Sequence, residues 1–154
     1  MQLLNRDFSV RWNPENPDTT FFCQSIALYT AFYHLQIQVH RPFLMKRSAL
    51  SRTSLAMCTN AARSTAHVLE AAMVRGVTLF PSSHVSFPRL GHGNWIDTVQ
   101  MSGFAASLVL LLTDWAHHQS ESTFDSKTTK DLVGKLFLSL RDGETRWHMA
   151  GRFV

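Results

Sequence analysis

Histidine is the first side chain of this sequence to consider for chemistry, because the chain carries eight of them. His34 and His40 are six residues apart, so on one helix they point in different directions and cannot bind the same metal ion. His117 and His118 are adjacent and diverge as well. Neither an HxH nor an HExxH pattern occurs, and two further histidines in a stretch rich in Gly and Pro lack Cys or acidic partners at ligand spacing. The pattern favours packing or surface histidines over a metal site.

Side chains for nucleophilic or acid–base catalysis do not fall into a recognised spacing. The GxSxG nucleophile turn is absent, and so are both common phosphate-binding loops, GxGxxG and GxxxxGK[ST]. Asp97 and Asp114 share one expected helix but lie roughly 25 Å apart along it, too far for a pair of catalytic carboxylates. The sequence predicts a protein that is not an enzyme. Catalysis would require residues distant in sequence to converge in the fold.

The two cysteines, Cys23 and Cys58, each lie within an apolar helical pattern, which is typical of buried free thiols. Two cysteines cannot build a disulfide framework. We therefore expect an intracellular, reducing environment and no cofactor in this chain.

The elements that would position these side chains are helices. Residues 21–44 predict one long amphipathic helix, capped at its start by Asp18 or Thr19. Pro42 lacks an amide hydrogen and disfavours helical dihedrals at Arg41, so we expect the helix to stop there. Apolar residues at steps of three and four form its inward stripe, which three more residues widen: Phe22, Ile26, Tyr29, Tyr33 and Ile37, then Phe32, Leu35 and Val39.

Four more helices are expected, and the fold class is an all-α bundle of about five helices. The second covers residues 51–75, stops at Gly76, and lies deep in the bundle because many of its inward residues are small. The third covers residues 94–117 and is apolar nearly all round, which indicates the centre of a larger helical body. The fourth begins at Asp125 or Ser126, carries the stripe Leu132, Leu136 and Leu140, and is broken by Asp142 and Gly143. A fifth begins within residues 144–153.

Three ordered stretches carry a family resemblance: residues 32–43 (FYHLQIQVHRPF), 54–64 (SLAMCTNAARS) and 146–152 (RWHMAGR). The first resembles the YH-L-x-I-x-x-HRPF signature of the fungal-specific transcription factor domain. The others look like the second conserved helix of that family and its RWHSAGR segment. The motif positions are Tyr33, His34, His40, Arg41, Pro42, Phe43, Asn60, Arg63, Arg146, Trp147, Gly151 and Arg152.

Residues 1–18 predict an entry segment and loop, because residues 13–18 carry two prolines among turn-forming and acidic residues. Over residues 19–154 the resemblance implies a regulatory domain cut short at its C-terminus. It implies a nuclear protein that regulates transcription by RNA polymerase II. Its partners would be other transcription proteins, a second copy of the chain, or a small-molecule effector. DNA would be bound only through the family's zinc binuclear cluster, for which the two cysteines here do not suffice. Zinc is implied for that module alone.

The arginines of the motifs admit two interpretations. Guanidinium groups can bond helix C-terminal carbonyls or carboxylates of a neighbouring helix, and this structural role is the one we favour. They could instead bind a small acidic effector between helices. The residues concerned are Arg41, Arg63, Arg146 and Arg152.

A second class of function stays open beside regulation. The chain could be a free-standing helical binding module for an apolar small-molecule effector or a partner protein, with a face of Trp95, Phe104 and Trp115 on the third helix as the small-molecule site.

Composition limits the partners. The net charge is +4 and the pI about 9.5, but the basic residues are scattered, and the densest patch, within residues 41–52, is typical of a solvated loop. A nucleic-acid surface would show a tighter basic stripe. The N-terminal sequence lacks the apolar core of a signal peptide. The most apolar run, residues 103–112, is about half the length of a bilayer span, so we expect a buried helix and no membrane contact.

Overall fold

The computed structural model describes residues 12–44, 50–76, 94–119 and 126–144. They form four helices: α1 (Thr19–Leu44), α2 (Leu50–Val74), α3 (Asn94–Gln119) and α4 (Ser126–Glu144). No strand occurs among these residues, so the predicted all-α class is confirmed. The fifth helix predicted within residues 144–153 falls on a segment of which only Glu144, the end of α4, lies inside the described residues.

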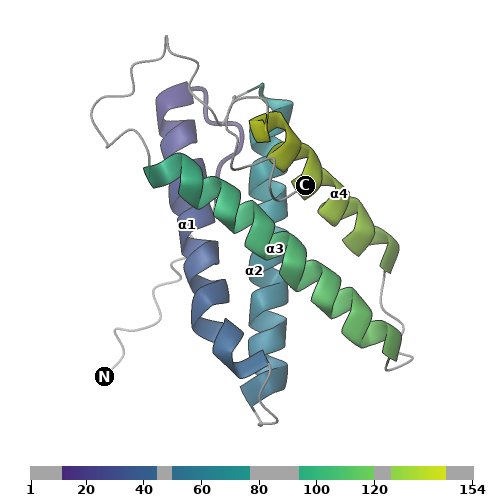
Figure 1. Ribbon diagram of the computed structural model, residues 1–154. Coiled ribbons are helices and arrows are strands. Elements are labelled where there is room, and N and C mark those ends of the chain that lie inside the picture. Colours follow the sequence, from purple (N-terminus) through teal and green to yellow (C-terminus); the bar gives the residue numbers. More distant parts are fainter. Residues whose placement is uncertain (1–11, 45–49, 77–93, 120–125, 145–154) are drawn as a thin grey trace, which may run out of the picture.

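The helices form a hairpin crossed by a second pair. α1 and α2 run antiparallel side by side, and α3 passes obliquely over both of them (Figure 1). α4 turns back beside α3 and packs against α2 as well. α2 and α3 each contact all three other helices, and the many buried residues of α2 agree with its predicted place deep in the bundle.

The core includes the whole predicted stripe of α4, Leu132, Leu136 and Leu140. Gly103 of α3 shows how tightly the helices meet, because an added Cβ would lie 3.3 Å from Leu69 Cδ1. Further along α3, the hydroxyl of Thr113 lies 3.0 Å from the hydroxyl of Thr59 of α2. The buried side chains include Phe22 and Ile26 of α1, Cys58, Ala62 and Leu69 of α2, Val99, Ala106 and Leu110 of α3, and Leu132, Leu136 and Leu140 of α4.

The segment before α1 packs against the α1–α2 hairpin. Asp18 Oδ1 accepts hydrogen bonds from the amides of Thr20 and Phe21 at 2.8 and 3.2 Å, which is the predicted cap. Trp12 stacks on Phe22 and donates from Nε1 to Ser25 Oγ at 3.2 Å.

The far end of α2 completes this attachment. Gly76, at φ +62°, ends the helix as predicted and donates its amide to the Met73 carbonyl. Arg75 Nη1 donates to the carbonyls of Pro14 and Asn16 at 2.9 and 2.8 Å. Its guanidinium also lies 4.0 Å from the centre of the Phe22 ring. One arginine thus joins the leading segment to both hairpin helices.

Two predicted helix ends are wrong. α1 does not stop at Arg41 and Pro42 but continues to Leu44. α4 is not broken at Asp142 and Gly143 but reaches Glu144. In both cases the unfavourable residue lies in the last turn, where a proline removes a single helical hydrogen bond and a glycine costs only about 1 kcal/mol. Neither penalty outweighs the packing of the preceding turns.

Candidate functional site

The motif residues of α1 and α2 meet where the hairpin closes. His40 Nδ1 lies 3.2 Å from Ser54 Oγ, the first residue of the second motif. One turn further along, the Cys58 thiol is 3.9 Å from the Ile37 carbonyl. Burial raises the pKa of Cys58, so this thiol is kept protonated and unreactive. These contacts join the first two motifs as parts of one helix–helix interface.

The other described motif residues of α1 and α2 differ in how they are placed. Tyr33 is half-buried and packs against the rings of Tyr29 and Phe32, with centroids 6.2 and 5.4 Å away. Five further positions differ in exposure: Arg41, Pro42 and Asn60 are exposed, whereas Phe43 and Arg63 are half-buried. The third motif, with Arg146, Trp147, Gly151 and Arg152, lies outside the described residues. The structural and effector-binding roles of the arginines both stay predictions.

His34 is placed differently from the other motif residues. Its Nε2 lies 3.2 Å from Gln38 Nε2, while its Nδ1 is buried and has no hydrogen-bond partner in the described part of the chain. Burial lowers the pKa of His34 below its ordinary value of 6.5. The ring is therefore neutral at neutral pH.

The half-buried ring of His34 makes stability depend on pH. Because the pKa of His34 is lower in the folded than in the unfolded chain, the unfolded chain takes up a proton first as the pH falls through 6.5. This contribution to stability is complete above pH 6.5 and is lost on acidification. We expect the free energy of unfolding, measured with urea, to decrease more between pH 7.5 and pH 5 in the unaltered chain than in His34→Gln. Stability profiles that fall in parallel with pH in the two chains would contradict this prediction. Both chains carry the same carboxylates, so the contribution of those groups cancels in the comparison.

Asp114, His118 and Ser126 form a polar cluster that sequence analysis missed. His118 Nε2 is 3.6 Å from Asp114 Oδ2 and 3.5 Å from Ser126 Oγ. In a catalytic triad the histidine uses one nitrogen for the carboxylate and the other for the hydroxyl. Here one nitrogen faces both groups, and the side chain of His118 is 63% exposed, so the arrangement does not activate the serine. The i,i+4 spacing of Asp114 and His118 was the available signal.

The described residues contain no group of three or more His, Cys, Asp or Glu side chains that could hold a metal ion.

α3 carries apolar side chains on its outward side as well as in the core. Its inward side carries Ser102, Gly103, Ala106, Ser107 and Thr113, and the hydroxyls of Ser107 and Thr113 bond carbonyls of α3 itself at 2.9 and 2.8 Å. Val99, Val109 and Leu110 are buried as well, but five other large apolar side chains point outward and are 40–61% exposed. We call them the α3 outer face: Met101, Leu108, Leu111, Leu112 and Trp115.

Of the binding face predicted on this helix, Trp115 belongs to the α3 outer face and Phe104 is half-buried. The side chain of Trp95 is not among those described.

α1 also exposes an apolar surface. Phe32, Leu35 and Val39, predicted to widen the inward stripe, lie on the opposite side, and the polar Thr30 is buried instead. Its hydroxyl is satisfied by the Ile26 carbonyl at 2.7 Å. We call the outward set, which is 54–71% exposed, the α1 outer face: Phe21, Leu28, Phe32, Leu35 and Val39.

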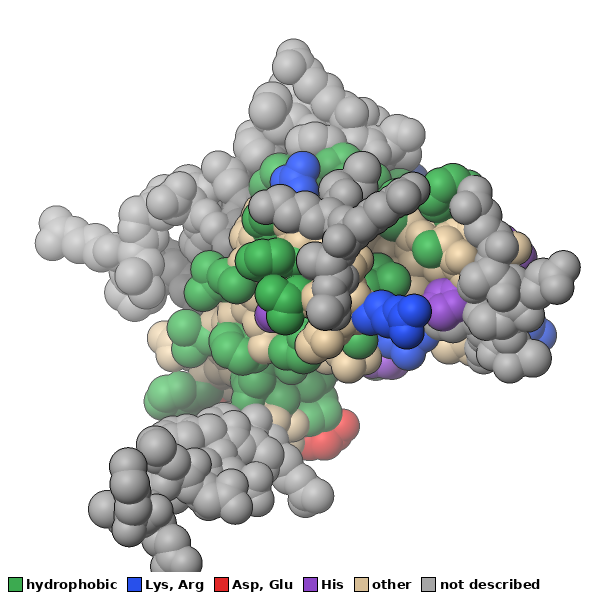
Figure 2. Space-filling view, turned by 90° about the horizontal axis from the view of Figure 1, so that it is seen from below, with side chains coloured by type: hydrophobic (Ala, Val, Ile, Leu, Met, Phe, Trp, Pro, Cys, Tyr) green, Lys and Arg blue, Asp and Glu red, His purple; other side chains and the backbone are tan. Residues whose placement is uncertain are grey.

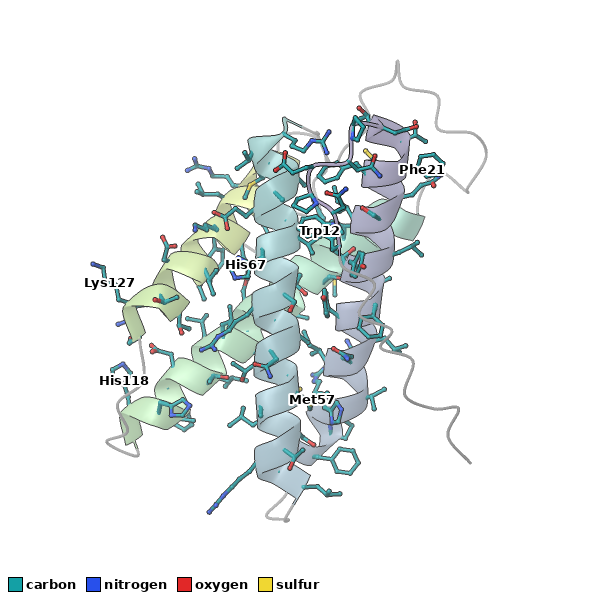
Figure 3. The ribbon with its side chains drawn as sticks, turned by 180° about the vertical axis from the view of Figure 1, so that it is seen from behind. Trp12, Phe21, Met57, His67, His118 and Lys127 are labelled. Atoms are coloured by element: carbon teal, nitrogen blue, oxygen red, sulfur yellow. The ribbon has the colours of Figure 1, made fainter. Side chains whose placement is uncertain are left out.

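Two views show how the apolar surface is distributed. Seen from the end where α1 and α2 are joined, hydrophobic side chains gather on the left side of the molecule, and most Lys, Arg and His side chains lie toward the right (Figure 2). From behind, Phe21 extends away from the bundle, whereas Trp12 lies close against the hairpin (Figure 3).

Within the described residues, Val99–His118 of α3 is the helix long and apolar enough to cross a membrane by length and composition. This span is longer than the ten-residue run that the sequence singled out. More than half of the window, 56%, is buried against the other helices, as in core helices of globular proteins that pass the same test.

A comparison of the chain with protein-family models, curated proteins and solved structures found no match. The resemblance to the fungal-specific transcription factor domain is thus carried by the three motif stretches.

Proposed function

We propose that the chain is a non-catalytic regulatory domain of a fungal DNA-binding transcription factor, and that it acts on transcription by RNA polymerase II in the nucleus. The motif stretches support the class of protein. The observation that carries the mode of action is the α3 outer face, where five large apolar side chains face solvent. Contiguous apolar surface of this kind marks protein interaction sites. The α3 outer face binds another transcription protein.

The shape of the face favours a protein over a small apolar effector. Small-molecule sites are concave and enclose most of the ligand surface. Leu112 and Trp115 instead stand on the outside of a helix, 53% and 61% exposed. A protein partner can cover such a helix with a groove of its own. Trp115 is the expected anchor, because tryptophan is enriched among the residues that dominate binding energy.

The proposal is tested by attaching the full chain to a heterologous DNA-binding module upstream of a reporter gene. We expect the chain to change reporter output, and Trp115→Ala to return it to the level of the module alone. Loss of a buried anchor costs about 2 kcal/mol or more, which weakens partner binding roughly thirtyfold. Melting temperatures verify that the variant is folded.

Leu138→Ala is the matched control, since Leu138 is 52% exposed but lies on α4. Reporter output that is the same with and without the tethered chain would contradict the regulatory proposal. Equal effects of the two substitutions would exclude the α3 outer face as the binding site for the partner protein. An apolar compound that raises the melting temperature of the unaltered chain but not of Trp115→Ala would favour the small-molecule alternative.

A further inference from the structure

The α1 outer face has the spacing of a helix that pairs with another helix. Its five side chains follow one another at steps of seven, four, three and four residues, which is the 3.5-residue repeat of a two-helix seam. They are also the more exposed of the two sets, with Leu28 at 71% and Phe21 at 62%. The core formed by the described helices does not include them, and they are exposed there.

The face carries no formal charge. No Lys, Arg, Asp or Glu occurs between Thr19 and His40. In paired helices, charged residues beside the seam select a partner of complementary charge, and cationic residues beside it favour a lipid surface. α1 has glutamines there instead: Gln24 and Gln38 are exposed and Gln36 is half-buried. An amide both donates and accepts hydrogen bonds, so it is complementary to its own copy.

We propose that the α1 outer face binds the same face of a second copy of this chain, with the two α1 helices antiparallel. A two-fold interface of this kind requires a self-complementary surface, and an uncharged apolar seam flanked by amides provides one. The proposal uses a different surface from the α3 outer face and goes beyond the proposed function.

Charge at one end of the hairpin sets the antiparallel orientation. Arg41 and Arg52 are exposed, and the contact of His40 with Ser54 places them at the same end. Parallel pairing would bring four arginines of two cationic chains together. Antiparallel pairing separates them by about 30 Å, the length of the face, which exceeds the distance over which charges interact at ordinary ionic strength. It also opposes the two helix dipoles favourably.

The pairing can be described residue by residue. A two-fold axis at the level of Thr30 places Leu28 opposite Phe32 of the second copy, and Phe21 opposite Val39. Exposures of 54–71% for five side chains correspond to on the order of 500 Å² per copy, close to the lower limit for a specific interface. The dimer is therefore expected to form reversibly in the micromolar range.

Sedimentation equilibrium of the full chain at increasing concentration tests the proposal. We expect a reversible monomer–dimer equilibrium that Leu28→Glu or Phe32→Lys each weakens at least tenfold. Mixing the two variants should restore association, because in the antiparallel arrangement the introduced carboxylate faces the introduced ammonium group. Leu138→Glu is the control for placing a charge at an exposed apolar position, and melting temperatures verify folding.

Salt supplies a second readout. Association between uncharged faces of two chains of net charge +4 should be unchanged or stronger at higher salt, because screening reduces their repulsion. A chain that stays monomeric at high micromolar concentration, including one that binds phosphatidylcholine vesicles instead, would overturn the proposal. A dimer that Trp115→Ala abolishes and Leu28→Glu leaves intact would also do so. Failure of the mixture to reassociate would overturn the antiparallel arrangement, and none of these results depends on the reporter assay.

Discussion

Replacing Phe22 with alanine is expected to lower the free energy of unfolding by about 3–5 kcal/mol, the usual cost of removing a fully buried aromatic side chain. Phe22 is 0% exposed and belongs to the core between α1 and α2. It also carries contacts from outside the hairpin, since Trp12 stacks on the ring at 6.2 Å and the guanidinium of Arg75 lies over it at 4.0 Å. Truncation therefore has two effects: it leaves a cavity in the core, and it removes the ring on which Trp12 of the leading segment stacks. Urea denaturation followed by circular dichroism measures the loss.

The neighbouring phenylalanine is a matched control. Phe21 is 62% exposed and extends away from the bundle, so Phe21→Ala should change the stability of the monomer by no more than about 0.5 kcal/mol. Both measurements are made at low protein concentration, so that self-association does not contribute. A similar loss in both variants would show that the rotation of α1 about its axis differs from the one described.

A second signal separates the two roles of Phe22. If the ring orders the leading segment, fluorescence of Trp12 should shift toward that of an exposed indole in Phe22→Ala under conditions where the helices remain folded. Four tryptophans contribute to the emission, so the shift is measured relative to Trp12→Phe in each background. An unchanged Trp12 signal would mean that Tyr29, 6.3 Å away, is sufficient to hold the indole.

Local sequence signals predict the elements of this fold well, because they depend on neighbouring residues alone. Asp18 caps α1, Gly76 ends α2, and the leucine stripe of α4 is buried. The errors at Pro42 and Gly143 have the same origin: a residue that would break the middle of a helix is tolerated in its last turn. Whether such a residue ends the helix depends on how close it lies to the helix end, and periodicity does not locate that end accurately.

The orientation of α1 and α3 could not be predicted from periodicity. Both helices are apolar on more than one side, so a stripe such as Phe32 and Leu35 is as regular as the stripe that is buried. Which side turns inward depends on how closely the neighbouring helix approaches. At the crossing of α3 over α2, small residues such as Gly103 allow the close approach and therefore face inward, and five large apolar residues of α3 are left on the outer face.

The candidate site could be predicted only in part, because its contacts also depend on how the helices are rotated. The motif stretches indicate where His40 and Cys58 lie along their helices, but their contacts with Ser54 and Ile37 depend on the rotation of two helices against each other. A single sequence contains no measure of that rotation. The α3 outer face was visible only as a helix apolar nearly all round, which is compatible with a central helix and with an exposed one.

The second large effect is expected where α3 crosses the other helices. Gly103 is buried, and a Cβ at this position would lie 3.3 Å from Leu69 Cδ1 and 3.9 Å from Leu140 Cδ2. Gly103→Leu adds further carbons into this filled space, so α3 must move away from α2 and α4. We expect a loss of about 3 kcal/mol in the free energy of unfolding. The better helix propensity of leucine, worth nearly 1 kcal/mol relative to glycine, does not offset it.

Gly134 provides the matched control, because it lies in the middle of α4 with no atom within 4 Å of an added Cβ. Gly134→Leu should therefore raise stability by up to about 1 kcal/mol through helix propensity alone. The two substitutions are chemically identical and both lie inside helices, so the difference in their free energies of unfolding isolates crowding at the crossing. Opposite signs are expected, and equal changes would mean that α3 lies further from α2 than the 3.3 Å approach to Leu69 implies.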